Sequence, residues 1–405
     1  MAATSRGNRG QFFGPTRSTF VAFFVAFFWG GFVVYVFAQY SNFSEYMVNF
    51  DGRRRAVSDL NNPYGHVQVD NTNRVSKEEV ASFQSHTHER QFGQDVVADS
   101  LFKDVRILCW ILSSPQNLKV KTIHVQATWT RRCNKVIFIS SEEDPSFPTV
   151  KVDAPEGRAF LWKKTRGAFQ YVYDHHLNDA DWFLKADDDT YVILENLRYM
   201  LADKDPQKLV YYGRKFKPYI KQGYMSGGAG YVLSKAAVVN VVEKAFKDNA
   251  LCKSASQGAG SAEDVEMGKC LENVGVVAGD SRDDQKRERF HPFIPEHHLI
   301  PGIVPQKFWY WDYVYYATSA GPECCSDYSI SFHYISPNTM YLLEYMIYHM
   351  RPFGIGHYTC PANIDTILKK TQLSAEEQLK VLSAEGNDVE VAKSKEKQGA
   401  VNLME

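Results

Sequence analysis

An uncharged apolar run near the N-terminus constrains the topology of this chain most. Phe20–Ala38 reads FVAFFVAFFWGGFVVYVFA. A helix of that length spans about 28 Å, close to the thickness of a hydrocarbon core. Three arginines precede the run and no acidic residue does, so the positive-inside rule places residues 1–19 in the cytosol and the bulk of the chain on the lumenal side. A cleaved signal peptide is the alternative, but its apolar region would be shorter, about 7–15 residues. We therefore expect a transmembrane signal-anchor at 20–38.

Two polar segments flank the part of the chain that has a globular pattern. Residues 39–100 show no sustained apolar period, and we interpret them as a lumenal stem. Residues 369–405 form a polar C-terminal tail, in which Ser374–Glu377 resembles a capping box. The one glycosylation sequon, at Asn42, lies so close to the predicted anchor that we do not expect it to be used. Residues 101–368 remain as the main globular domain.

Within that domain, apolar strand patterns alternate with helical ones. The strands are expected at 105–112, 135–140, 181–186 and 209–212, and the helices at 119–132, 158–177, 196–202 and 234–247. This order predicts an α/β fold with a mostly parallel sheet flanked by helices. In such sheets, ligands bind at the edge where the strands have their carboxyl ends. The formal net charge of -1 gives no basic excess, which argues against a nucleic-acid partner.

Three consecutive aspartates follow one predicted strand. Asp187, Asp188 and Asp189 come directly after the apolar run DWFLKA. Adjacent carboxylates repel one another, and a hard divalent cation such as Mn²⁺ or Mg²⁺ would relieve that repulsion. A solvated acidic turn is the alternative. The position at the carboxyl end of a strand favours a metal site that also holds the phosphates of a substrate.

Three further segments are candidates for the same site. Glu263 and Asp264 open a predicted helix that Ser261 could cap, and a carboxylate there could act as a general base, although the helix macrodipole alone also favours acidic residues at that position. His333 could complete a metal shell or have a purely structural role. Gly227 and Gly228 would let the backbone approach a ligand closely, or form an ordinary loop.

Taken together and in this order, these segments resemble the inverting β1,3-glycosyltransferases, whose fold is the GT-A-like nucleotide-sugar-binding fold. The resemblance covers roughly residues 105–356 and includes ATWTRR at 127–132, LKADDD at 184–189 and EDV at 263–265. The stretches RFHPFIPEHHLIPG at 289–302, FWYW at 308–311 and CCSD at 324–327 resemble the branch of core 1 β1,3-galactosyltransferases more specifically.

The resemblance implies an enzyme that transfers galactose from UDP-galactose to the 3-hydroxyl of GalNAc-α-Ser/Thr on glycoproteins, with inversion and with Mn²⁺ as the cofactor. It implies Asp187, Asp189 and His333 as metal ligands and Asp264 as the catalytic base, with Glu263 the less favoured base. It implies donor or acceptor binding by the following residues: Asp187, Arg131, Gly227, Gly228, Glu263, Trp309, Tyr310 and Trp311.

The same resemblance carries expectations about place and partners. It implies a single-pass type II protein of the Golgi membrane with a lumenal catalytic domain at 101–368, and it makes a homodimer and a dedicated chaperone expected partners. In an oxidising lumen, the cysteines are expected to pair as Cys109–Cys133, Cys252–Cys270 and the adjacent Cys324–Cys325. Cys360 is then left over, free or bridging to another chain.

Three rival interpretations stay open at this point. A non-catalytic chaperone of the core 1 β1,3-galactosyltransferases resembles these enzymes but lacks the acidic metal motif. This chain retains that motif at Asp187–Asp189. A related transferase could use a different donor, because donor choice depends on a few hydroxyl contacts. A lectin-like homologue would keep the fold and need no base at Asp264.

Overall fold

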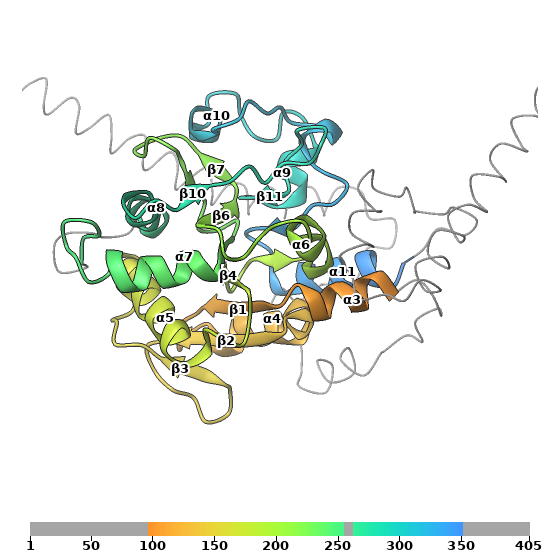
Figure 1. The fold of residues 1–405 in the computed structure, drawn as a ribbon. Helices are drawn as coiled ribbons and strands as arrows, with labels where there is room; N and C mark the ends of the chain where they lie inside the picture. The colour runs from red at the N-terminus through yellow and green to blue at the C-terminus, as the bar shows by residue number, and fades with distance from the viewer. Residues whose placement is uncertain (1–95, 255–261, 351–405) are drawn as a thin grey trace, which may run out of the picture. The chain divides into compact units, whose positions relative to one another are not determined.

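The computed structural model describes residues 96–254 and 262–350, and its centre is a seven-stranded sheet (Figure 1). The strand order is β10-β6-β9-β4-β1-β2-β3, and every neighbouring pair is parallel except the two pairs that involve β9. The prediction of an α/β fold with a mostly parallel sheet is confirmed. The strands are β1 Ile107–Leu112, β2 Lys135–Ser140, β3 Thr149–Lys151, β4 Trp182–Asp187, β6 Val210–Gly213, β9 Tyr231–Ser234 and β10 Val277–Ala278.

Strand β1 shows why the sheet is central. All six of its residues are buried, as expected for a parallel strand that is covered on both faces. Its side chains alternate between two hydrophobic cores: Leu108 and Trp110 belong to one, and Ile107 and Cys109 to the other. The period of two along a strand therefore divides an uninterrupted apolar run between the two faces of the sheet.

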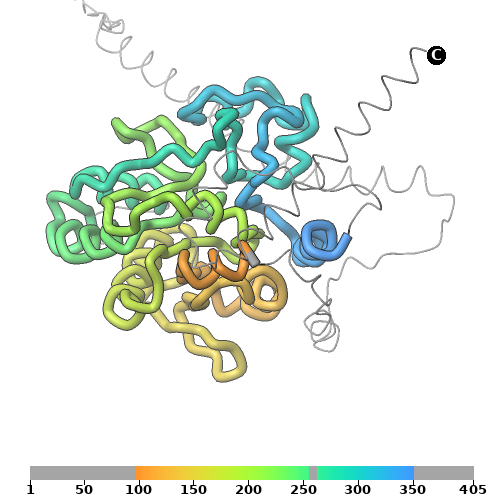
Figure 2. Tube along the Cα trace, turned by 45° about the vertical axis from the view of Figure 1, so that its right-hand side comes forward, coloured from red at the N-terminus to blue at the C-terminus, as the bar shows by residue number. Residues whose placement is uncertain are grey.

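Helices form a layer on each face of the sheet (Figure 1). One layer contains α5 Leu161–His176, α7 Lys235–Asn240 and α8 Glu263–Asn273. The other contains α3 Val96–Asp104, α4 Ile123–Ala127, α6 Leu194–Leu201 and α11 Pro337–Tyr348. Figure 2 shows α11, in blue, beside the orange segment that holds α4, and the two helices are in contact.

A small second sheet brings distant parts of the chain together. It contains β11 Phe290–His291, β12 Ser331–Phe332 and β5 Tyr191–Val192. Strand β12 pairs antiparallel with β5, with Phe332 opposite Tyr191. His333 follows β12 and Asp189 lies just before β5, so this pairing sets the two side chains next to each other.

The remaining named helices and strands lie in the upper part of Figure 1. They are the hairpin of β7 Lys215–Phe216 and β8 Tyr224–Met225, then α9 Pro295–Leu299 and α10 Trp309–Tyr313. A third apolar cluster joins the hairpin to α10 and includes Phe216, Phe293 and Tyr310. This cluster contains part of the HPFIP and FWYW segments that the sequence analysis singled out.

Two local expectations were wrong, those for the helix at 119–132 and for the cap of α8. The helix expected at 119–132 is broken into a π turn at Leu118–Thr122, α4, and a 3₁₀ turn at Trp129–Arg132, because the backbone leaves the helical region at Thr128 (φ -108°, ψ -106°). The helix expected at 234–247 is present: α7 continues into a π-helical turn at Val241–Ala245. The N-cap of α8 is Ala262 rather than Ser261, and it makes no side-chain capping bond.

All three expected disulfides are present: Cys109–Cys133, Cys252–Cys270 and Cys324–Cys325. Cys360, Asn42, the predicted anchor at 20–38, most of the stem and the tail at 369–405 lie outside the described residues. Among the residues that are described, no helix is long and apolar enough to cross a bilayer.

Candidate active site

A cavity of about 840 Å³ opens at the carboxyl ends of β1 and β4. These strands are parallel neighbours, with Leu112 opposite Asp187, so the residues that follow them meet at one edge of the sheet. Asp187, Asp188 and Asp189 line the cavity together with Asp264 and His333. Segments almost 150 residues apart in the sequence thus contribute acidic and imidazole groups to one space.

Asp187, Asp189 and His333 form the only group in the described residues whose ligand atoms could hold a metal ion. Their ligand atoms all lie within 4.8 Å of one another, and His333 Nε2 is 3.1 Å from Asp189 Oδ1 and 3.8 Å from Asp187 Oδ2. Burial acts to raise the pKa of Asp189, but His333 and Lys121 hold it well below its ordinary value. Two carboxylates and one imidazole are a donor set that fits a divalent cation such as Mn²⁺.

Asp188 has a different role from its two neighbours. Its carboxylate accepts hydrogen bonds from Asn117 Nδ2 at 2.9 Å and from Ser113 Oγ at 3.2 Å. The side chain is buried, and burial together with the charge of Asp189 raises its pKa to about 6. Asp188 therefore ties β4 to the segment after β1. It is not a member of the possible metal-binding cluster of Asp187, Asp189 and His333, which we call the metal group.

Lys185 links the metal group to the start of α8. It is 1% exposed, forms an ion pair with Asp187, donates to the Gly227 carbonyl at 3.0 Å and lies 3.9 Å from Glu263 Oε2. Burial acts to lower the pKa of Lys185, but Asp187 and Glu263 raise it above its ordinary value. The lysine therefore stays protonated and balances the negative charge on both sides of it.

Glu263 and Asp264 differ in how they are held. Glu263 Oε1 accepts a hydrogen bond from Tyr231 Oη at 2.6 Å, and burial raises the pKa of Glu263 to about 7. Asp264 is only half-buried and accepts backbone N–H bonds from Gly227 at 3.1 Å and Val265 at 2.9 Å. Burial raises the pKa of Asp264, while those bonds partly lower it. Among the described residues, the hydrogen bonds to the Asp264 carboxylate therefore come from backbone N–H groups, whereas Glu263 is held by a side chain.

The two predicted glycines both lie where a side chain would not fit. A Cβ on Gly228 would come within 2.2 Å of the His333 ring, and one on Gly227 within 2.8 Å of Glu263 Oε2. These glycines therefore let the loop after β8 pass between the metal group and α8. Both glycines line the cavity, and their contact with a ligand stays a prediction.

The three residues of the FWYW segment that were predicted to bind substrate are placed differently. Trp309 lines the cavity. Tyr310 is buried and bonds to Arg214, and Trp311 Nε1 donates to the Pro305 carbonyl at 2.9 Å. Tyr310 and Trp311 are not among the residues that line the cavity, so of the three only Trp309 is brought to the site.

Arg131 is also not among the cavity-lining residues. Its guanidinium pairs with Glu344, a fully buried carboxylate on α11. Arg132 pairs with the same carboxylate at 2.6 Å, and Tyr191 Oη donates to it at 2.9 Å. The ATWTRR segment thus anchors α11 in this structure.

Several lining residues were missed by the sequence analysis. Ser113 and Asn117 follow β1, and Lys164 donates to the Ser113 carbonyl at 2.9 Å and pairs with Glu156 at 2.6 Å. Tyr334, next to His333, also lines the cavity. The end of the first strand, at Leu112, was a usable signal for Ser113. No local pattern marked the other residues.

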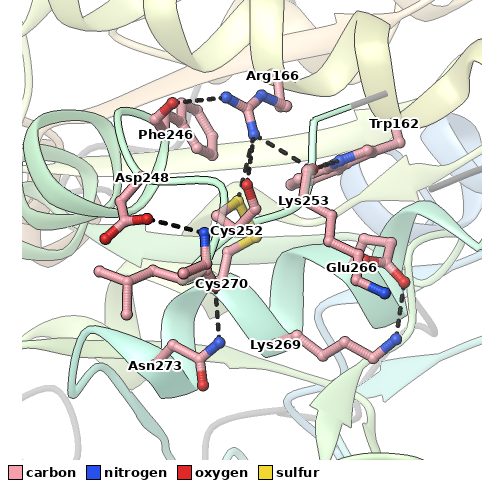
Figure 3. The surroundings of a disulfide bond; sticks show 12 residues. Trp162, Arg166, Phe246, Asp248, Cys252, Lys253, Glu266, Lys269, Cys270 and Asn273 are labelled. Carbon is pink, nitrogen blue, oxygen red and sulfur yellow. Dashed lines mark hydrogen bonds and ion pairs between the residues drawn. A yellow bond between two sulfur atoms is a disulfide. The ribbon is translucent and has the colours of Figure 1, made fainter. Parts of the chain in front are cut away.

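A disulfide anchors the helix that carries Glu263 and Asp264 (Figure 3). Cys270 of α8 is bonded to Cys252. Arg166 of α5 donates to the carbonyls of Phe246 and Cys252, at 2.8 Å and 3.3 Å. Covalent and polar contacts therefore hold α8 against α5 and limit how far the acidic residues at its start can move.

The comparisons with known proteins identify the family. A Fringe-like family model matches residues 116–283. The chain is 54% identical over 259 residues to a glycoprotein-N-acetylgalactosamine 3-beta-galactosyltransferase 1 of Xenopus laevis, a match that covers 64% of this chain and 70% of that protein.

More distant relatives match shorter parts. A mouse beta-1,3-glucosyltransferase is 26% identical over 46% of this chain and 37% of its own length. Human chondroitin sulfate synthase 3 is 23% identical over 41% of this chain and 20% of its own length. The frog match covers more than two thirds of that protein at high identity, so the chain belongs to the glycoprotein-N-acetylgalactosamine 3-beta-galactosyltransferase family.

Proposed function

We propose that this protein is a metal-dependent, inverting β1,3-galactosyltransferase. It transfers galactose from UDP-galactose to the 3-hydroxyl of GalNAc-α-Ser/Thr on glycoproteins, which forms the core 1 O-glycan. One observation carries the proposal: in a chain of this family, Asp187, Asp189 and His333 line the same cavity as Asp264. A leaving diphosphate and a nucleophilic hydroxyl then have separate places in one space.

The proposed cofactor is Mn²⁺, held by Asp187, Asp189 and His333. When bound, the metal supplies Lewis-acid stabilisation of the departing diphosphate. Lys185, protonated beside Asp187, adds a fixed positive charge near the same place. The cavity residues Ser113, Asn117 and Asp188 are the proposed contacts of the nucleotide. Ser113 and Asn117 follow the neighbouring strand β1 at the same edge of the sheet, and both donate hydrogen bonds to Asp188.

Asp264 is the proposed general base. It accepts the proton of the acceptor hydroxyl while that oxygen attacks the anomeric carbon and the bond to the UDP oxygen breaks. Glu263 is less suited to this role, because Tyr231 and Lys185 already engage its carboxylate. Gly227 and Trp309 line the space around Asp264 and are proposed contacts of the sugars.

The cellular setting is also a proposal. We infer a single-pass type II protein of the Golgi membrane, anchored by residues 20–38, with a lumenal catalytic domain at 101–368. The three disulfides support an oxidising compartment. A homodimer and a dedicated chaperone are the proposed protein partners.

The test uses the full chain, purified in detergent under oxidising conditions. It is incubated with a GalNAc-Thr glycopeptide, Mn²⁺ and a panel of UDP-sugars, and the products are weighed by mass spectrometry. We expect the mass of one hexose to be added only with UDP-galactose, and EDTA to prevent it. Transfer from another donor would change the substrate assignment. A folded protein without any transfer would favour the chaperone or lectin-like interpretations.

A further inference from the structure

Five aromatic rings form a strip that leads from the metal group out of the cavity. In order from the metal group outward, the aromatic strip is Tyr334, Phe293, Trp309, Tyr313 and Tyr219. The rings follow one another at centroid distances of 6.3 Å, 6.0 Å, 5.0 Å and 6.1 Å. The first ring also lies 3.9 Å from that of the metal-group residue His333. The first four rings line the cavity, and the last is 68% exposed.

Backbone pairing holds the outer end of the strip in place. Tyr219 lies in the turn of the β7–β8 hairpin, and Tyr313 ends α10, which lies beside β7 in Figure 1. Lys217 N–H donates to the Tyr313 carbonyl at 2.8 Å. The hydroxyls of Tyr219 and Tyr313 are 2.7 Å apart. The outer rings are therefore fixed before any ligand arrives, which lowers the entropy cost of binding.

Two residues of the strip have unfavourable backbone conformations. Among the described residues other than glycine, only three have positive φ, and two of these are the ends of the strip, Tyr219 at 70° and Tyr334 at 58°. Such conformations cost free energy for bulky residues, and they cluster where a chain contacts ligands. In Tyr219 this conformation presents a large ring to solvent, where it adds nothing to the hydrophobic core.

The chemistry of the strip limits what it can bind. None of its five side chains carries a charge at neutral pH, and its rings combine apolar faces with three tyrosine hydroxyls. Aromatic-lined surfaces of this kind bind extended, proline-containing polypeptide, whose left-handed helix is formed in advance. Segments rich in Ser, Thr and Pro are also typical carriers of O-linked sugars.

We propose that the aromatic strip binds the uncharged, proline-containing polypeptide on either side of the sugar-bearing Ser or Thr of the acceptor. This inference rests on the proposed function, which places the acceptor hydroxyl at Asp264. Asp264 and four rings of the strip line the same cavity. A polypeptide attached to a sugar at Asp264 would therefore leave the cavity along the strip, and Tyr219 would be its outermost contact.

The test compares acceptors with and without polypeptide. GalNAc-α-methyl glycoside carries only the sugar. Two GalNAc-Thr peptides are compared with it, one with flanking prolines and one with flanking aspartates. We expect Tyr219→Ala to raise the KM for the proline peptide roughly five- to tenfold, the loss of one aromatic contact, and to leave the KM values for the methyl glycoside and UDP-galactose unchanged. Tyr219→Phe keeps the ring and should stay close to the unmodified protein.

Two further variants keep the test decisive. Tyr219→Gly adopts a φ of 70° without strain, so it removes the ring even if the alanine variant folds poorly. Tyr345→Ala, on α11, is the matched control, because Tyr345 is 51% exposed and outside the strip. The proposal that the strip binds polypeptide would be overturned if Tyr219→Gly changed the KM for the proline peptide and for the methyl glycoside equally, or changed neither. If the unmodified protein transfers galactose to none of the GalNAc acceptors, the proposed function is overturned. The assignment of acceptor polypeptide to the strip then falls with it.

Discussion

At the scale of single residues, Asp264 is the group on which the proposed chemistry depends most directly. Asp264→Asn keeps the shape of the side chain and an oxygen acceptor for one backbone N–H, but it cannot take a proton. We expect kcat to fall by about 10²–10⁴-fold while the Kd for UDP stays unchanged. Steady-state kinetics and calorimetric titration with UDP measure the two quantities. Turnover at the normal rate would show that another group is the base.

Glu263 gives a second prediction, about stability and pH. Its pKa in the folded protein is raised to about 7, from an ordinary value of 4.5, because the carboxyl is buried. The protonated form therefore favours folding, so its contribution to stability is fully present below about pH 4.5 and is lost as pH rises through about 7. Urea unfolding between pH 4.5 and 7.5, in EDTA, should show this decline. Glu263→Gln should weaken the decline, and an identical pH dependence in that variant would exclude Glu263 as its source.

The residues that sequence reasoning found and missed differ in physical kind. Asp187 and Asp189 follow an apolar strand, and that pattern is visible locally. Lys185 belongs to the same strand, but its contacts with Gly227 and Glu263 depend on the antiparallel pairing of β4 with β9. No local pattern specified that pairing. His333 was found only as a candidate, because its position next to Asp189 depends on the pairing of β12 with β5.

At the scale of elements, α11 shows how a buried charge can fix a helix. The carboxylate of Glu344 is fully buried, and Arg131, Arg132 and Tyr191 bind it. Glu344→Gln should lower the free energy of unfolding by about 3–5 kcal/mol, because it leaves buried positive charge unpaired. Arg131→Ala should cost less, about 1 kcal/mol, because its side chain is 32% exposed.

The same pair of variants tests the predicted role of Arg131 in substrate binding. If the arginine acts only through Glu344, the KM for UDP-galactose in Arg131→Ala stays at the unmodified value. A raised KM without loss of stability would support a direct contact with the nucleotide. Urea unfolding and initial rates at varied donor concentration separate these outcomes.

Helices and strands could be predicted from the sequence where one pattern of apolar residues runs through the whole element. The four expected strands and the long helix at 158–177 appear within a few residues of their predicted ends. The helix expected at 119–132 failed because tertiary packing overrides local propensity: Trp129 is fully buried in the core, and the chain turns at Thr128 to place it there. Short strands such as β5 and β12 have only two residues each and carry no readable period.

At the scale of the whole molecule, a bound metal should stabilise the fold, because its ligands come from two distant segments of the chain. Asp187 ends β4, Asp189 lies two residues further on, and His333 follows β12, so unfolding separates them. A ligand that binds only the folded state adds about 2.7 kcal/mol at 100 times its Kd. For a domain of this size, that corresponds to a rise in Tm of roughly 5–10 °C.

We therefore expect Mn²⁺ to raise the Tm of the unmodified protein and EDTA to reverse the change. Asp189→Ala and His333→Ala should lose the shift, since each removes one ligand. Asp188→Asn is the matched control: that side chain bonds to Ser113 and Asn117 and lies outside the metal group, so the variant should retain the shift even if its starting Tm is lower. A full Mn²⁺ shift in Asp189→Ala would mean that the ion binds elsewhere. Because Tm is measured without substrate, this result separates metal binding from every later step of transfer.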